Sequence, residues 1–463
     1  MKKGLFLLVI LVIASVTGTV NAVKLVSGQQ ESVEIEQQVI SGDPLAAEGW
    51  QIRTGSSCDG KLSWETVFPA RDGAAAESEF VFRARGERID RIAVWEEGVY
   101  LGSPSGFGMG GSISLEGVEY QEIFEQIAER TPAGETREET ITLADYYEYY
   151  PLRLEIRGGE YVFYMNEWDT DSQVYQALQQ ALRIPVHPEE KLVLAVGKNE
   201  QGVITDIGCN SAEGFLDTRT SGIFREDGCY FTCTPVYWNG EREEPIRGAE
   251  NVIYHMPIRI NENREVSGYD RIEVVIPLPA DCKAQHLAED EAGNLLLLSE
   301  QGGKLVLTVY ENGTWQQLQQ LELLPMGAED YFDRMTIAEE GTLISMGDGA
   351  FCFLTRSQED YKITIRGSLA LENDKHAALI HYSDFAYDGE NLAVVGCPYR
   401  FLDANNSVYL GIYSQAGTEY VGFYGHSGDI DWKFGGIISM NCSHDEGDDG
   451  LRVVQVMEQG TGR

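Results

Sequence analysis

The sequence predicts a mostly β protein built from short antiparallel meanders, and the stretch from residue 285 to 323 shows why. Three apolar runs follow one another there, at Leu295–Leu298, at Leu305–Tyr310 and from Trp315 onward. Gly302-Gly303 separates the first two runs, and Asn312-Gly313 follows the second. Both dipeptides suit the type I′ turns of tight hairpins, which need positive φ at two central positions. The stretch therefore predicts a meander of short strands.

This pattern recurs along the second half of the chain. A turn containing an acidic residue and a glycine precedes an apolar run at Gly293, Gly341 and Gly389, which are 48 residues apart each time. That period lies in the range of structural repeats that each form one small sheet. The repeat is regular only from about residue 283, so residues 283–463 show it best.

These units resemble the repeats of β-propeller proteins, and the resemblance covers some 180 residues. It implies a ring of about seven blades, each an antiparallel meander. It implies no activity, because propellers carry many unrelated functions. The middle of the chain, at residues 145–156 and 183–196, also looks like uncharacterised secreted bacterial proteins, and that likeness adds no activity either.

Two segments carry helical rather than strand periodicity. Residues 120–130 place Tyr120, Ile123, Phe124 and Ile127 on one helical face. Residues 172–183 do the same with an apolar stripe that begins at Val174. We therefore expect two short helical insertions in a β protein.

The other alternating or apolar segments predict further strands. A hairpin is expected around residues 157–159, and a second one joins 191–196 to 203–208 across KNEQG. Asn239-Gly240 predicts a turn after a strand at 228–238. Additional strands are expected at 33–35, 79–84, 89–101, 252–260 and 272–277.

The chain divides into a signal peptide at 1–22, an acidic lead-in at 23–45 and one propeller-like domain at 46–463. A ring leaves no sheet edge unpaired. We therefore expect residues 451–457 to pair within a sheet built partly from the N-terminal half. The alternative is an N-terminal α+β domain before a smaller C-terminal β domain.

The first residues have the features of a bacterial secretory signal. Lys2 and Lys3 precede the apolar core Leu5–Val16, and Val20-Asn21-Ala22 offers small residues for cleavage. The core is shorter than the ~20 apolar residues of a spanning helix. The protein is thus expected outside the cell or in the cell envelope. An uncleaved N-terminal anchor is the alternative.

The charge balance restricts the partners. The chain has 74 acidic residues against 35 Lys and Arg, a formal net charge of −39. Such a chain repels phosphate backbones and anionic lipids, so neither nucleic acid nor a membrane surface is expected as a partner. Aromatic residues make up 10% of the chain, which favours a folded, solvated surface over disorder. A protein or carbohydrate ligand remains.

Most of the eight cysteines are interpreted as small buried apolar residues. Cys229 and Cys233 lie on one expected strand, which sets them ~13 Å apart, beyond the reach of a disulfide. Their spacing, without a second pair, does not match a zinc site. We assign no metal and no cofactor.

One segment resembles a motif of sialidase propellers, the Asp-box. Residues 308–315 match it at Thr308, Thr314 and Trp315. Tyr310 stands where the motif has Asp, and the glycine is displaced to Gly313. Because such boxes are structural turns, the match does not indicate a sialidase.

The remaining candidate sites have simpler interpretations. The Gly-rich segment 103–111 has no following Lys-Ser/Thr and reads as a surface loop. The acidic segment 445–450 matches a calcium loop only in part. Asp429 and Asp431 form a carboxylate pair of the kind that a glycosidase uses, although such pairs arise by chance in a chain with 74 acidic residues. The seven histidines stand singly, and His381 suits packing better than catalysis.

The function predicted from the sequence is therefore a secreted or envelope-associated binding module without catalysis. No catalytic residue is assigned and the ligand stays open. A hydrolase acting on extracellular carbohydrate and a membrane-tethered sensor domain are the alternatives.

Overall fold

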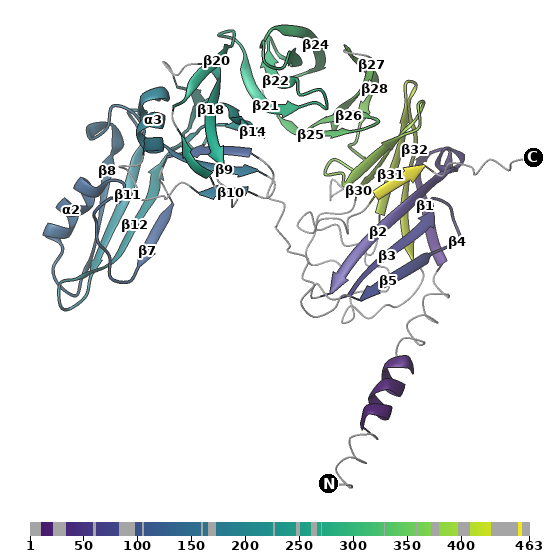
Figure 1. The fold of residues 1–463 in the computed structure, drawn as a ribbon, viewed down its shortest axis with the longest axis horizontal. Helices are drawn as coiled ribbons and strands as arrows, with labels where there is room; N and C mark the ends of the chain where they lie inside the picture. The colour runs from purple at the N-terminus through teal and green to yellow at the C-terminus, as the bar shows by residue number, and fades with distance from the viewer. Residues whose placement is uncertain are drawn as a thin grey trace, which may run out of the picture. The chain divides into compact units, whose positions relative to one another are not determined.

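The computed structural model describes most of the chain, and its elements are strands with a few helices (Figure 1). The described residues are 11–21, 34–58, 62–82, 98–103, 106–158, 161–164, 173–225, 227–246, 251–260, 266–269, 271–327, 329–357, 360–371, 379–396, 408–426 and 452–455. All the strand pairs among them are antiparallel. The predicted mostly β class is confirmed.

The chain forms two compact units. One unit is continuous, from residue 95 to 327, and is called the central unit here. The other joins residues 1–94 to residues 328–463 and is called the terminal unit. Each unit has its own sheets and core.

The central unit contains both predicted helices, α2 (Gln121–Arg130) and α3 (Gln173–Ala181). Its sheets are β7-β12-β11-β8, β10-β9-β6, β13-β16-β17, β14-β15-β18 with β19 and β20, and β21-β22-β23-β24. The strands are β6 (Gly98–Gly102), β7 (Phe107–Gly110), β8 (Thr136–Thr142), β9 (Arg153–Gly158), β10 (Tyr161–Tyr164), β11 (Lys191–Lys198), β12 (Ile204–Glu213), β13 (Phe215–Asp217), β14 (Ser221–Arg225), β15 (Gly228–Thr232), β16 (Val236–Trp238), β17 (Glu243–Pro245), β18 (Val252–Ile260), β19 (Val266–Tyr269), β20 (Glu273–Pro277), β21 (Lys283–Glu289), β22 (Leu295–Gln301), β23 (Lys304–Tyr310) and β24 (Gln317–Pro325).

The terminal unit contains three sheets, with the orders β25-β26-β27-β28, β29-β30-β31-β32-β1-β4 and β33-β2-β3-β5. Its strands are β1 (Glu34–Gly42), β2 (Trp50–Cys58), β3 (Leu62–Pro69), β4 (Ala74–Ala75), β5 (Glu77–Phe82), β25 (Phe332–Ala338), β26 (Gly341–Met346), β27 (Ala350–Ser357), β28 (Asp360–Ser368), β29 (Asp384–Tyr387), β30 (Leu392–Gly396), β31 (Val408–Ser414), β32 (Gly417–His426) and β33 (Arg452–Gln455). Residues 11–21 form a helix.

Three successive sets of four strands form meanders in the second half of the chain. β21–β24, β25–β28 and β29–β32 each pair in chain order. Gly293, Gly341 and Gly389 occupy equivalent positions, where the first strand of a meander passes to the second. All three have positive φ, of 79°, 154° and 101°, which explains the glycine at each turn.

The central strands of these meanders are buried on both faces. In β30, Leu392 and Val394 belong to one core cluster, whereas Ala393 and Val395 belong to another. The first cluster includes side chains of β26 and β27, and the second includes side chains of β2 and β3. Because successive strand residues point to opposite faces, β30 binds its sheet to a neighbouring sheet on each side.

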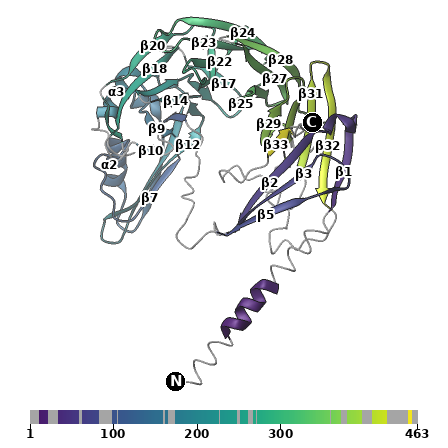
Figure 2. The ribbon, with the colours of Figure 1, turned by 45° about the vertical axis from the view of Figure 1, so that its right-hand side comes forward.

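The two ends of the chain meet in shared sheets of the terminal unit. β33 pairs with β2, in register from Trp50 with Gln455 to Arg53 with Arg452. β1 pairs with β32, and Figure 2 shows the two strands side by side. The pairing confirms the expectation that the segment 451–457 joins a sheet made of N-terminal strands.

Three expectations about local structure were wrong. The expected strand 228–238 is two strands, β15 and β16. They are separated at Thr234-Pro235, where proline cannot donate to a ladder. The turn at Asn312-Gly313 is not a two-residue hairpin, because β23 and β24 are paired only from Tyr310 with Gln317 outward. The segment 103–111 is not wholly a loop, because β7 pairs with β12.

Deleting residues 450–463 should destabilise the protein, because it removes β33 and leaves one edge of β2 without its partner. We expect a lower melting temperature, by about 2–4 °C for each kcal/mol of lost stability. Calorimetry of the full chain and the truncated chain measures the shift. Deleting only residues 457–463 is the matched control. Equal melting temperatures for all three chains would contradict a structural role for the β33 pairing.

Candidate functional site

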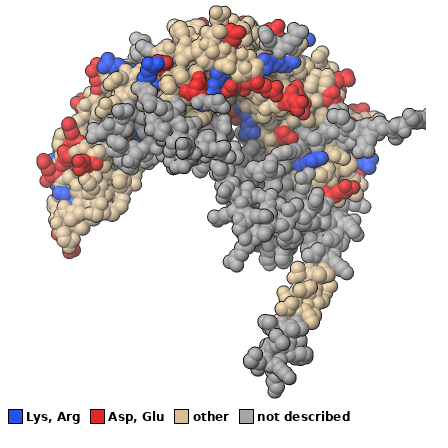
Figure 3. Space-filling view, viewed as in Figure 1, with Lys and Arg blue, Asp and Glu red and all other residues tan. Residues whose placement is uncertain are grey.

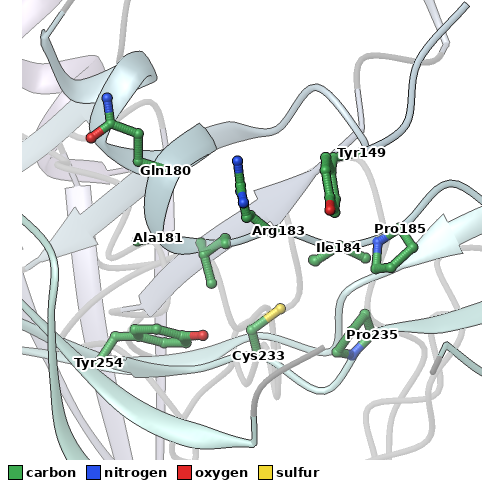
Figure 4. A pocket seen from close by; sticks show the side chains of 10 residues that line it. Tyr149, Gln180, Ala181, Arg183, Ile184, Pro185, Cys233, Pro235 and Tyr254 are labelled. Carbon is green, nitrogen blue, oxygen red and sulfur yellow. The ribbon is translucent and has the colours of Figure 1, made fainter. Parts of the chain in front are cut away.

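The central unit contains a cavity of about 380 Å³ between two layers of its core. One wall is the C-terminal end of α3 and the segment that follows it, with Arg183, Ile184 and Pro185. The other wall carries Cys233 and Tyr254 (Figure 4). The volume lies in the usual range of about 300–1,000 Å³ for small-molecule sites.

The helical wall is held in place by its backbone. Leu182 N donates to Leu178 O (2.8 Å), and Tyr150 N donates to Ile184 O (2.9 Å). Tyr149 and Pro185 form an isolated β-bridge. Leu182 and Ile184 are buried. The segment 181–185 is therefore a fixed wall, and alternate residues of it face the core.

The strand wall is neutral. Tyr254 on β18 stacks on Phe231 of β15, with ring centroids 5.3 Å apart. The Cys233 thiol donates to Thr218 O at 3.6 Å. Burial raises the pKa of Cys233 to about 12, so the side chain stays a thiol at neutral pH. A thiol in this state is a poor nucleophile, and this wall offers packing rather than chemistry.

The cation at the cavity is Arg183. Its guanidinium carbon lies 5.2 Å from the centroid of the Tyr149 ring, a cation–π contact. The two side chains stand next to each other in Figure 4. Arg183 is exposed and Tyr149 is half-buried. The pair therefore places a positive charge at the edge of the cavity, next to an aromatic ring.

A buried carboxyl group lies close to this wall in the chain. Tyr150 Oη donates to Glu190 Oε2 at 2.5 Å, and His187 N donates to Tyr150 Oη at 3.0 Å. Glu190 is fully buried. Burial raises the pKa of Glu190 to about 7, although the hydrogen bond from Tyr150 acts in the opposite direction. Within the described part of the chain, Glu190 Oε1 has no hydrogen-bond partner.

His187 connects this carboxyl group to the sheet of β13, β16 and β17. Its ring stacks on Tyr237, with centroids 3.7 Å apart, and its Nε2 lies 3.7 Å from Glu244 Oε2. The network joins segments that are about 50 residues apart in sequence. Its members are packed together, so we interpret it as support for the cavity wall rather than as a catalytic group.

A serine and a histidine contact each other among the described residues of the central unit. Ser221 Oγ lies 3.3 Å from His286 Nδ1 and accepts a hydrogen bond from Leu287 N at 2.9 Å. The serine oxygen thus links β14 to β21. The pair ties two sheets together, away from the residues that line the cavity.

The residues singled out from the sequence do not build a site. Asp429, Asp431 and the segment 445–450 lie outside the described residues. Thr308 is buried in β23, and Trp315 packs against a core cluster. Among described residues, no group of three or more His, Cys, Asp and Glu is placed to hold a metal ion.

No motif in the sequence indicates the cavity. Tyr149, Arg183 and Cys233 come from three separate segments. None of these segments carries a recognised motif. The two helices were the only signal that could have been used, because they interrupt the strand pattern where the cavity forms.

The described surface carries mainly acidic charge, as the net charge of −39 predicts (Figure 3). Acidic side chains outnumber basic ones over the face drawn in Figure 3. No helix among the described residues has the length and apolar character that crossing a membrane requires.

Comparisons with known proteins assign no family. No family model matches the chain, and no curated protein matches it. A solved protein from Lactobacillus plantarum is 10% identical with a TM-score of 0.24, over 51% of this chain and 78% of that one. The periplasmic gluconolactonase of Pseudomonas aeruginosa is 15% identical with a TM-score of 0.25, over 50% and 62%.

The NanB sialidase of Streptococcus pneumoniae is 9% identical with a TM-score of 0.24, over 82% of this chain and 61% of that chain. Because these TM-scores are below 0.5, the likenesses carry no argument about the activity of this chain.

Replacing Glu190 by Gln should change how stability depends on pH. The pKa of Glu190 is raised in the folded state, so the folded protein holds this proton more tightly than the unfolded chain does. The stability from this group is therefore present below about pH 4.5 and is lost as the pH rises through about 7. We expect the wild type to lose up to about 3 kcal/mol relative to Glu190→Gln between pH 5 and 8.

Urea unfolding of both proteins across this pH range measures the difference. Glu189→Gln, at the exposed neighbouring position, is the control and should follow the wild type. Parallel stability curves for the wild type and Glu190→Gln would show that Glu190 does not titrate abnormally.

Proposed function

We propose that this protein is an exported recognition module of β-propeller type that binds a small molecule in the cavity of the central unit. The cavity between α3 and the sheet of β15 and β18 is the observation that carries the proposal. It combines a cationic rim, aromatic rings and a neutral buried thiol.

The propeller architecture is supported by three successive meanders with the same strand order. Sheets buried on both faces need a sheet on each side, and a ring of sheets provides that throughout. The pairing of β33 with β2 and of β1 with β32 is how a ring would be closed by the chain ends. About seven blades remains the number we propose, with the helices of the central unit as insertions.

Export is proposed from the basic, apolar and small-residue segments of the first 22 residues. Cleavage after Ala22 should give a mature chain that begins at Val23. N-terminal sequencing of the exported protein measures this directly. A protein that begins at Met1 and stays in the membrane fraction would establish the tethered alternative instead.

Binding is favoured over catalysis by the chemistry of the walls. Cys233 is held neutral, and Glu190 is enclosed by Tyr150 and the core. A catalytic acid or base has to reach the substrate within about 3 Å, directly or through one water. The extracellular carbohydrate hydrolase remains the second candidate, with Asp429 and Asp431 as its carboxylates.

A thermal-shift screen of the full chain against small metabolites and oligosaccharides tests the binding function. A compound that occupies the cavity should raise the melting temperature, since it binds only the folded state. Ala181→Phe, which places a ring at the cavity wall, should abolish that shift. Gln176→Phe, at an exposed position of the same helix, should retain it.

Two results would contradict the proposal. A shift that survives in Ala181→Phe would place the ligand elsewhere. Turnover of a polysaccharide that falls ~100-fold in Asp429→Asn or Asp431→Asn would identify a hydrolase, since that is the loss expected for a catalytic acid or base.

A further inference from the structure

The cation at the cavity differs from the other cations of the central unit. Within its described side chains, the other Lys and Arg residues each contact a carboxylate or a backbone carbonyl. These are Arg130, Arg137, Arg153, Lys191, Lys198, Arg219, Arg225, Arg242, Arg271, Lys283 and Lys304. Arg183 makes its contact to a ring, that of Tyr149. Acidic groups are abundant in this chain, so partners for an arginine are not scarce.

The contact with Tyr149 leaves the hydrogen-bonding edge of Arg183 available. A guanidinium that lies over a ring uses its face, whereas its N–H groups point outward in the plane. Those groups match the two oxygens of a carboxylate in a bidentate arrangement.

The rest of the cavity offers apolar side chains beside the polar side chain of Gln180. Ile184, Pro185 and Pro235 line it together with the ring of Tyr254. The thiol of Cys233 already donates to Thr218 O. The walls therefore add contact area, and Arg183 provides the charge.

We propose that the cavity binds a small molecule with one carboxylate attached to an apolar ring or chain, and that Arg183 is the residue that selects the carboxylate. This inference rests on the proposed binding function and defines its ligand class. The acidic surface opposes anions at long range, so selection depends on the short contact with Arg183.

Three matched probes test the inference by calorimetry on the full chain: phenylacetate, phenylacetamide and phenethylamine. They share a benzyl group and are anionic, neutral and cationic. We expect phenylacetate to bind about 10- to 100-fold more tightly than phenylacetamide, as a charge-assisted bidentate pair should. Phenethylamine should bind no more tightly than phenylacetamide. Added salt should weaken the binding of phenylacetate only.

Arg183→Gln should remove the preference for the acid and leave the amide unchanged. Arg183→Lys should keep part of the preference for the acid, because the positive charge remains but the two parallel N–H donors of the guanidinium are lost. Arg271→Gln, which removes an exposed and paired arginine outside the cavity, is the control and should bind like the wild type.

Equal affinities for the acid and the amide, or an acid preference that survives Arg183→Gln, would overturn the inference and leave the cavity as a binding site. Absence of binding by all three probes would also overturn it. In that case a thermal shift by another compound, lost in Ala181→Phe, would still support the proposed function. If no compound gives a thermal shift that depends on the cavity, both the inference and the proposed binding function are wrong.

Discussion

The burial of the central meander strands on both faces is the constraint on which the rest of the fold depends. Leu295, Leu296, Leu297 and Leu298 of β22 are each fully buried. A strand with apolar side chains on both faces cannot lie at a surface without exposing one of them, at about 25 cal/mol per Å² of apolar area. Each such sheet must therefore be covered on both sides.

The core clusters show how this requirement is met inside each unit. Leu295 and Leu297 pack in a cluster that also contains Tyr230 and Ile253 of the preceding sheet. The adjacent residues of that sheet, Cys229 and Phe231 among them, belong to the cluster beneath the helices. Period-2 alternation thus directs neighbouring residues into different cores, and one strand holds three layers together.

Arg225 shows how two of these layers are fixed to each other. It donates to Glu289 Oε2, to Gly293 O and to Asn312 Oδ1, which all belong to the sheet of β21–β24. The rings of Tyr230 and Trp315 lie within 5.5 Å of its guanidinium. An arginine of β14 therefore determines the form of two loops in the next sheet.

This contact explains why one turn was predicted wrongly. Asn312-Gly313 favours a tight hairpin locally, but Asn312 is held by Arg225 and its N–H donates to Asn294 Oδ1. The loop opens to make these contacts, with Trp315 at a positive φ of 57°. Tertiary hydrogen bonds outweighed the local preference, and a single sequence contains no sign of them.

Where local chemistry was sufficient, the sequence-based predictions were confirmed. Gly302-Gly303 forms its hairpin with φ of 56° and 74°. The acidic residues of the repeat turns also have a local role: Asp290 Oδ1 accepts from Asn294 N, and Asp388 Oδ1 accepts from Asn391 N. The two helices, the β18 strand and the Gly302-Gly303 hairpin could be predicted for the same reason, since each depends on residues close in sequence.

The cavity could not be predicted, because its formation depends on packing between segments that are distant in sequence. One wall comes from α3 and the segment after it, and the other comes from β18 and the segment after β15. Tyr149, Arg183 and Tyr254, which line it, are up to 105 residues apart in the chain.

The regular meanders and the irregular insertion thus have different roles. The meanders bury their central strands on both faces, whereas α3 and the segment after it form one wall of a cavity beside Arg183. The cavity lies where a helix, rather than a strand, forms one of its walls. Arg183 follows the last residue of α3 by two positions, and it is the cationic side chain among the residues that line the cavity.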